Sequence, residues 1–201
     1  MNITEQSLEI LREISSKMEG NTFHHHFHFL YDIPIRENGY YVEIGCYAGA
    51  SSCLMLQKEK INVVSIDLGF PVDQSIAEDN IKKFNAKENF FRYIKGNSHA
   101  EDTIEKLKTI TKEIDILFVD GDHTKESVMK DFFIYSDLVI SGGYIVFDDY
   151  NDHEYSPEVK LAVDSIVEKT SHNYEIIGTI ENTFGARPRN LPGNCFVMRK
   201  L

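Results

Sequence analysis

Two groups of carboxylates are the side chains of this sequence best suited to chemistry. Asp120 follows an apolar run at 114–119, and Asp148 and Asp149 follow a second run at 144–147. Both runs have strand length, and in α/β proteins the carboxyl ends of neighbouring strands form the ligand-binding edge. Clustered carboxylates repel one another unless a cation compensates them. We expect these three aspartates to bind a divalent metal such as Mg²⁺; helix caps and surface carboxylates are the alternative.

His123 stands three residues after Asp120. A neutral imidazole near a substrate can accept a proton at physiological pH, because its ordinary pKa lies close to neutrality. We predict that His123 is a catalytic general base. The alternative is a polar residue at the start of a helix.

A glycine-bearing turn follows the apolar run at 40–44. Gly45 and Gly49 would let the backbone turn sharply and let a ligand approach closely. A dinucleotide fingerprint needs G-x-G-x-x-G, but residue 47 is tyrosine and the two glycines are four residues apart. A purely structural turn is the alternative. We expect a cofactor to contact this turn and its flanks, namely Glu43, Gly45, Cys46, Tyr47, Gly49 and Ser51.

Polar residues also end the next two predicted strands. Asp67 closes the second strand, 22 residues after Gly45, where an acid can accept hydrogen bonds from the ribose hydroxyls of a nucleoside. An exposed loop aspartate or a helix cap is the alternative. Asn97 and Ser98 follow the third strand and would contact an adenine edge or cap the next helix.

These residues need a regular framework of alternating strands and helices. Hydrophobic patterning predicts strands at 40–44, 63–66, 90–94, 114–119, 144–147, 174–180 and 195–199. Helices are expected at 51–60, 75–85, 103–107, 125–135 and 157–169, the last with Ser156 as its cap and Pro157 at its first position. This order predicts an α/β fold, a Rossmann-like, doubly wound and mostly parallel sheet with an antiparallel hairpin at one edge.

We expect a single domain in which residues 40–201 form the core and residues 1–39 form an N-terminal helix and a histidine-rich segment on the substrate side. If the segment 22–31 is extended, alternation places His24, His26 and His28 on one side. Hydrogen-bonded histidines lining a substrate entrance are expected here, and a second metal site is the alternative.

The candidate substrate residues are spread along the chain. His25 and His26 belong to the histidine-rich segment, and His153 and Tyr155 follow the aspartate pair. Arg187, with Arg189 beside it, could bind a phosphate or nucleotide on an acceptor, although a solvated turn is equally compatible with this stretch.

Composition excludes some classes of partner. The 201 residues carry a net charge of −11, and 42% are hydrophobic. A nucleic-acid partner would need a basic surface, and no apolar run is long enough to span a membrane. Three cysteines at no metal-binding spacing predict small apolar residues in a reducing cytoplasm. We expect a cytoplasmic protein, with a homo-oligomer possible.

Taken in order, these motifs resemble class I S-adenosylmethionine-dependent methyltransferases. The stretches 118–131 (FVDGDHTKESVMKD) and 142–149 (GGYIVFDD) resemble the metal-dependent O-methyltransferases of the macrocin and mycinamicin type. The resemblance covers roughly residues 40–150. It implies an S-adenosylmethionine site that includes Asp120, a Mg²⁺ held by Asp120, Asp148 and Asp149, and a general base at His123.

The implied reaction is methyl transfer from S-adenosylmethionine to a hydroxyl of a sugar, glycan or similar polyhydroxylated small molecule. Mg²⁺ would lower the pKa of the hydroxyl and orient it. A catechol-type enzyme acting on a phenol is one alternative, although such enzymes usually have lysine where this chain has His123. A non-catalytic nucleoside-binding scaffold is another.

Overall fold

A central sheet organises the protein in the computed structural model, which describes residues 2–20, 25–180 and 194–201. Across these residues the sheet has seven strands in the order β3-β2-β1-β4-β5-β7-β6. The strands are β1 (Tyr40–Ile44), β2 (Asn62–Asp67), β3 (Phe90–Lys95), β4 (Ile114–Val119), β5 (Val139–Phe147), β6 (Tyr174–Ile180) and β7 (Cys195–Lys200). The first five are parallel, and β7 lies antiparallel between β5 and β6. The predicted mostly parallel sheet with an antiparallel edge hairpin is confirmed.

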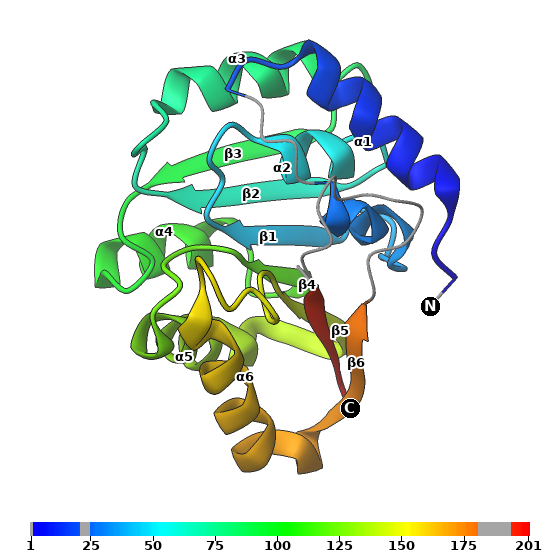
Figure 1. Cartoon of the computed structure of the whole chain (residues 1–201). Coiled ribbons are helices and arrows are strands. Elements are labelled where there is room, and N and C mark those ends of the chain that lie inside the picture. The colour runs from blue at the N-terminus through cyan, green and yellow to red at the C-terminus, as the bar shows by residue number, and fades with distance from the viewer. Residues whose placement is uncertain (1, 21–24, 181–193) are drawn as a thin grey trace.

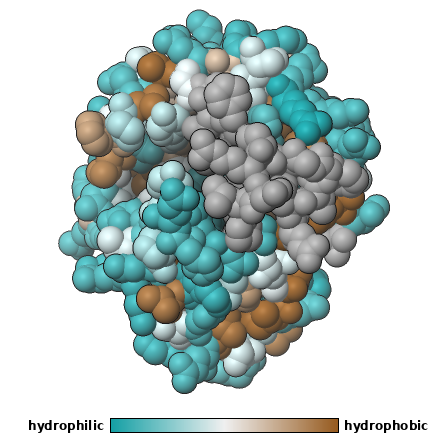
Figure 2. Space-filling model, in the orientation of Figure 1, coloured by the Kyte–Doolittle hydropathy of each residue, from teal (hydrophilic) through white to brown (hydrophobic). Residues whose placement is uncertain are grey.

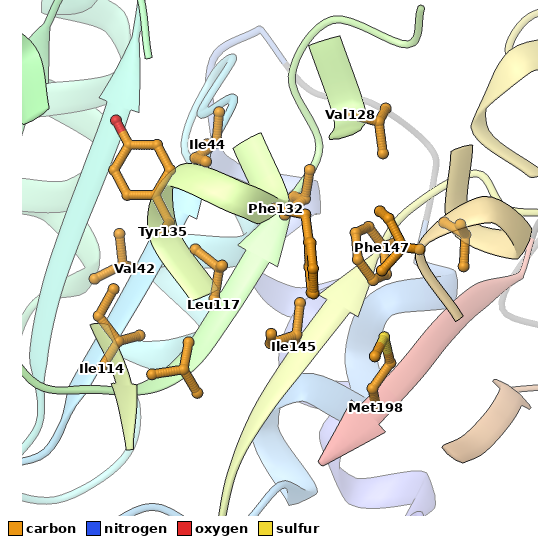
Figure 3. Close-up of a cluster of buried hydrophobic side chains, with 14 of the residues drawn as sticks. Val42, Ile44, Ile114, Leu117, Val128, Phe132, Tyr135, Ile145, Phe147 and Met198 are labelled. Atoms are coloured by element: carbon orange, nitrogen blue, oxygen red, sulfur yellow. The ribbon is translucent and has the colours of Figure 1, made fainter. Parts of the chain in front are cut away.

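Helices cover both faces of the sheet (Figure 1). They are α1 (Glu5–Lys17), α2 (Ala50–Met55), α3 (Gln74–Phe84), α4 (Glu101–Ile110), α5 (Lys125–Tyr135) and α6 (Pro157–Thr170). Two apolar cores result, because α4, α5 and α6 pack on one face and α1, α2 and α3 on the other. In the first core, Phe132 of α5 lies 6.1 Å from Phe147 of β5 and 5.7 Å from Tyr174 of β6, measured between ring centroids (Figure 3).

The N-terminal segment belongs to the second core. The histidine-rich stretch is not extended: residues His26–Asp32 form a 3₁₀ helix, η1, which packs against α1 and α2. The predicted alternation is therefore wrong for this stretch, and His26 and His28 are both buried. Asp32 at the end of η1 accepts hydrogen bonds from the backbone and hydroxyl groups of Thr4, the residue that caps α1. This contact fixes the start of α1 to the end of η1.

Two elements differ from their predicted bounds by five residues at one end. Helix α2 ends at Met55 and is shorter than predicted. Strand β5 begins at Val139, so Gly142 and Gly143 lie inside the strand and do not precede it. Gly142 has a φ of +80°, and the pairing of β5 with β4 shifts register nearby. Between the pairs Ile114–Val139 and Ile116–Tyr144, β4 advances by two residues and β5 by five, so the irregularity accommodates three extra residues while the strand continues.

On the face shown in Figure 2, hydrophilic side chains dominate and apolar ones form separated groups. The most exposed large apolar side chains include Leu68 and Phe70, which follow β2. Within the described part of the chain, no helix has both the length and the apolar character that crossing a membrane requires.

Candidate active site

A cavity of about 640 Å³ opens at the carboxyl ends of β1 to β5. This is the edge at which parallel α/β sheets bind ligands. Eleven of the predicted site residues line it: Gly45, Cys46, Tyr47, Ser51, Asp67, Asn97, Ser98, Asp120, His123, Asp148 and Asp149. The tertiary structure therefore brings most of the predicted cofactor residues and all of the predicted metal residues to one cavity, whereas Glu43 and Gly49 are not part of its lining.

The turn after β1 needs glycine for two reasons. Gly45 has a φ of +89°, and a Cβ atom at this position would overlap the backbone carbonyl of Asp120 after β4. Gly49, the N-cap of α2, has a φ of +87°. Tyr47 also has a positive φ, 48°, which is uncommon for a residue with a side chain. The turn is thus held against the end of β4 in a conformation that faces the cavity.

Glu43 lies behind the cavity wall and is fully buried. Hydroxyl groups donate to its carboxylate from Tyr41 (3.0 Å), Ser52 (2.7 Å), Ser65 (2.8 Å) and Ser51. Burial raises its pKa, although the serine hydroxyls act in the opposite direction. In this geometry Glu43 supports Ser51 and helix α2 and does not face a ligand directly.

Asp67 fixes the same turn. Its Oδ2 accepts hydrogen bonds from the backbone amides of Cys46 (2.7 Å) and Tyr47 (3.1 Å), and its Oδ1 accepts one from Gly69. The carboxylate also lines the cavity, and each oxygen can accept more than one hydrogen bond. Asp67 therefore connects the ends of β1 and β2, and its contact with a ribose stays a prediction.

Asn97 and Ser98 form the cavity wall after β3. The Asn97 Oδ1 accepts a hydrogen bond from the backbone amide of His99 (2.8 Å), and the Ser98 carbonyl accepts one from Tyr135 (2.6 Å). The cap of α4 is Ala100, so these two residues do not cap that helix. Their side chains instead shape a loop beside the cavity.

Asp120, Asp149 and His123 form a partly exposed cluster at the other end of the cavity. One ligand atom from each lies within 4.8 Å of the others. The His123 Nε2 is 3.5 Å from Asp120, and its Nδ1 is 3.9 Å from Asp149. The hydrogen bond with Asp120 raises the pKa of His123 to about 9, against the effect of burial. Burial and the neighbouring Asp148 raise the pKa of Asp120 well above its usual range.

Ser156 connects His123 to Asp149. The Ser156 hydroxyl donates to Asp149 Oδ2 at 3.1 Å and lies 2.8 Å from His123 Nδ1. Because the hydroxyl proton points to the carboxylate, the serine oxygen accepts from Nδ1–H, and a neutral His123 then carries its lone pair on Nε2. The prediction that Ser156 is the N-cap of α6 is confirmed, but its side chain makes no capping hydrogen bond.

Asp148 is buried and faces two side chains from distant parts of the chain. Its Oδ1 lies 2.6 Å from His26 Nε2 and accepts a hydrogen bond from the Cys195 thiol at 3.0 Å. Burial opposes ionisation of Asp148, yet the charge and hydrogen bond of His26 hold its pKa below the usual range. Cys195 is therefore more than the small apolar residue predicted, because its thiol contacts a site carboxylate.

The other predicted substrate residues that the structure describes are not part of the cavity lining. His25 is the N-cap of η1, while His153 and Tyr155 are exposed in the segment before α6. Arg187 and Arg189 fall outside the described residues, as does His24. None of the three that are described (His25, His153 and Tyr155) is part of the cavity wall in this structure.

Sequence patterns missed four residues that contribute to this site. Ser156 was predicted only as a helix cap, and Cys195 only as an apolar residue. Leu68 and Phe70 line the cavity although both are largely exposed. Their position immediately after Asp67 was the one signal in the sequence that could have placed them beside a ligand.

Comparison with known proteins identifies the family. Residues 42–150 match a family model described as a methyltransferase domain, and this match covers more than half of the chain. The chain belongs to this methyltransferase family. The matched region begins in β1 and ends just after the aspartate pair, so it includes the glycine turn and the carboxylate cluster.

A viral protein and two solved structures illustrate the likeness. The chain is 39% identical over 193 residues to uncharacterized protein R132 of Acanthamoeba polyphaga mimivirus, covering 89% of this chain and 86% of the viral protein. It matches the O-methyltransferase NovP with a TM-score of 0.60 at 17% identity, over 98% of this chain and 78% of NovP. It matches a Bacillus cereus O-methyltransferase in complex with SAH with a TM-score of 0.61 at 14% identity, over 100% and 82% of the two chains. At such identities the two solved structures support the methyltransferase fold.

Proposed function

We propose that this methyltransferase is a Mg²⁺-dependent O-methyltransferase that transfers the methyl group of S-adenosylmethionine to a hydroxyl of a sugar, glycan or similar polyhydroxylated small molecule. One observation carries the proposal: the glycine turn with Asp67 and the Asp120–His123–Asp149 cluster line the same cavity. A methyl donor and an acceptor hydroxyl need such adjacent sites, because the reaction requires their alignment.

The cofactor end of the cavity suits a nucleoside. The amides around Gly45 are held by Asp67, whose carboxylate faces the cavity, and Asn97 and Ser98 complete the wall. Leu68 and Phe70 supply apolar surface for a base. When bound, S-adenosylmethionine would supply an already activated methyl group on its sulfonium. The SAH bound to the Bacillus cereus structure of the same fold supports this choice of donor.

The acidic end of the cavity fits a hard cation. Asp120 and Asp149 offer carboxylate oxygens within 4.8 Å, and Asp148 adds a third carboxylate at the cavity wall. A divalent ion prefers such oxygen ligands and would lower the pKa of an acceptor hydroxyl. Burial and the charge of Asp148 raise the pKa of Asp120, and a bound cation would act in the opposite direction.

His123 is placed to accept the proton of the acceptor. Its Nε2 is directed toward Asp120, while its Nδ1 is held by Ser156. The carboxylates keep His123 protonated at neutral pH, since they raise its pKa to about 9. Charge compensation at Asp120 and Asp149 lowers the pKa of the imidazole, so cation binding and a neutral base at His123 are expected together.

The remaining properties follow from charge and composition. A net charge of −11 disfavours nucleic-acid acceptors and favours a small-molecule or glycan acceptor. We propose a cytoplasmic location, since three buried free cysteines fit a reducing compartment. The proposed sources of acceptor contacts are His25, His26, His153, Tyr155 and Arg187, which come from three separate parts of the sequence.

Calorimetric titration with S-adenosylmethionine, with and without Mg²⁺, tests the proposal. We expect S-adenosylmethionine to bind in both conditions. Methyl transfer to glycan or nucleotide-sugar acceptors, measured by mass spectrometry, should occur only when Mg²⁺ is present. Asp149→Asn should abolish turnover and leave cofactor affinity within a few-fold. Asparagine is chosen because Asp149 has a positive φ, which asparagine tolerates. Absence of cofactor binding would contradict the whole proposal, whereas metal-independent turnover would contradict its metal half.

A further inference from the structure

A second group of potential metal ligands lies beside the acidic cluster and is chemically different from it. His26, Asp148 and Cys195 each offer one ligand atom, and these atoms lie within 4.8 Å of one another. The exposed fractions of the three residues are 5%, 6% and 1%. The donors are nitrogen, oxygen and sulfur, whereas the partly exposed cluster supplies oxygen from Asp120 and Asp149 with nitrogen from His123.

Three separate parts of the fold create this group. His26 begins η1, Asp148 follows β5, and Cys195 begins β7. Strands β5 and β7 pair antiparallel with Phe147 opposite Phe196, so Asp148 and Cys195 face one another one residue further along. The 3₁₀ turn of η1 then directs His26 onto the same carboxylate oxygen. Sheet register and the packing of η1 fix the arrangement, so it does not depend on a surface loop.

We propose that His26, Asp148 and Cys195 form a binding site for a borderline-soft divalent cation such as Zn²⁺ or Co²⁺. A mixed imidazole, carboxylate and thiolate set matches the ligand preference of these ions and not that of Mg²⁺. The site goes beyond the proposed function, although it shares Asp148 with the acidic cluster.

The geometry needs little adjustment to hold such an ion. His26 Nε2 and Cys195 Sγ lie 2.6 Å and 3.0 Å from Asp148 Oδ1. In a tetrahedral zinc site with bonds of 2.0 to 2.3 Å, these donor atoms would be separated by about 3.3 to 3.5 Å. Each pair therefore has to separate by roughly 0.5 to 0.7 Å, and a fourth ligand completes the tetrahedron.

Binding exchanges protons for the cation. The thiol proton of Cys195 now lies in a hydrogen bond to Asp148, and it is released to solvent when the sulfur becomes a thiolate ligand. His26 binds through Nε2 as a neutral imidazole, so any proton on that nitrogen is released too. The cation replaces these protons as the positive partner of Asp148, and no redox change is involved.

Titration of the chelator-treated full chain with Co²⁺ under anaerobic conditions tests the site without any methyl donor or acceptor. We expect a thiolate-to-cobalt charge-transfer absorption in the near ultraviolet that saturates at one equivalent and disappears when Zn²⁺ is added. Mg²⁺ should not displace it. The absence of this absorption from the wild-type chain overturns the proposal, whatever the result for Mg²⁺-dependent methylation.

Four single variants, two of them controls, identify the sulfur and the imidazole. Cys195→Ser should remove the charge-transfer absorption, whereas the matched controls Cys46→Ser and Cys53→Ser, at the other two buried cysteines, should keep it. His26→Gln should weaken Co²⁺ binding by about 10- to 100-fold. If Cys195→Ser keeps the absorption, the assignment is overturned. If a control variant loses the absorption, the sulfur ligand is a different cysteine and the assignment is also overturned. If a variant does not fold, the wild-type titration alone decides.

Discussion

At the scale of single residues, the orientation of His123 depends on a hydroxyl that is not part of the cavity lining. Ser156 lies between His123 Nδ1 and Asp149, and its hydrogen bonds select the tautomer with a free Nε2. Under the proposed function, His123 is the catalytic residue and Ser156 is a positioning residue. The same serine is the N-cap of α6 but makes no capping hydrogen bond through its side chain, so its hydroxyl does not stabilise the start of that helix.

We therefore predict that Ser156→Ala lowers kcat by about tenfold while KM and the thermal midpoint change little. His123→Ala should lower kcat further, by roughly 10²- to 10⁴-fold. Steady-state kinetics and thermal unfolding check both variants. Ser156→Thr keeps the hydroxyl and should restore most of the activity, and Ser165→Ala, elsewhere on α6, should behave as wild type. A lower thermal midpoint with unchanged kcat in Ser156→Ala would show a merely structural role.

At the scale of elements, the cavity depends on the close approach of the turn after β1 to the end of β4. Gly45 touches the backbone of Asp120, so the cofactor turn and the first metal carboxylate are positioned by the same contact. Parallel pairing of β1 with β4, with Ile44 opposite Val119, sets this contact. A change at the turn is therefore expected to disturb both ends of the cavity.

Gly45→Ala should destabilise the protein by more than about 3 kcal/mol, because two costs add. Alanine is strained at a positive φ, and its methyl group would overlap the Asp120 carbonyl, so the backbone would have to move. The matched control is Gly178→Ala in β6, where φ is +91° and no atom lies within 4 Å of the added Cβ. The control should lose only about 1–2 kcal/mol. Urea unfolding measures both values, and equal losses would mean that the contact with Asp120 carries no energetic weight.

At the scale of the whole molecule, buried polar groups as well as apolar packing hold the two helices of the N-terminal segment, α1 and η1, together. His28 is buried, and its Nδ1 lies 2.7 Å from the Ser7 hydroxyl of α1. Burial lowers the pKa of His28 from 6.5 to about 4, although Asp32 acts in the opposite direction. The folded protein thus keeps this imidazole neutral at a pH where an unfolded chain would protonate it.

This difference makes stability depend on pH in a defined direction. Between pH 6.5 and about 4 the unfolded chain binds the additional proton, so the contribution of His28 is complete above pH 6.5 and is lost as the pH falls. From about pH 7.5 to about pH 5, the free energy of unfolding should fall by about 2 kcal/mol through this group. In urea titrations, His28→Gln should remove this part of the pH dependence of the free energy of unfolding. His172→Gln, at an exposed histidine, should leave it unchanged. Equal pH dependence in wild type and His28→Gln would contradict the prediction.

Sequence patterns determined the order of strands and helices, the doubly wound sheet and most of the cavity wall. The reason is local: hydrophobic periodicity and turn residues fix each element, and parallel strands bring their carboxyl ends together. Gly45, Asp67, Asp120 and Asp149 could be placed because each ends a strand or lies within two residues after one.

Contacts between distant segments were decided only by the tertiary structure. The pairing of Asp148 with His26 and Cys195 depends on the packing of η1 and on the antiparallel register of β7, and no local pattern encodes either. The same holds for the hydroxyl of Ser156, which contacts His123 across a separation of 33 residues. Residue types and spacing identified the candidate chemistry, whereas the long-range geometry decided which side chain holds which carboxylate.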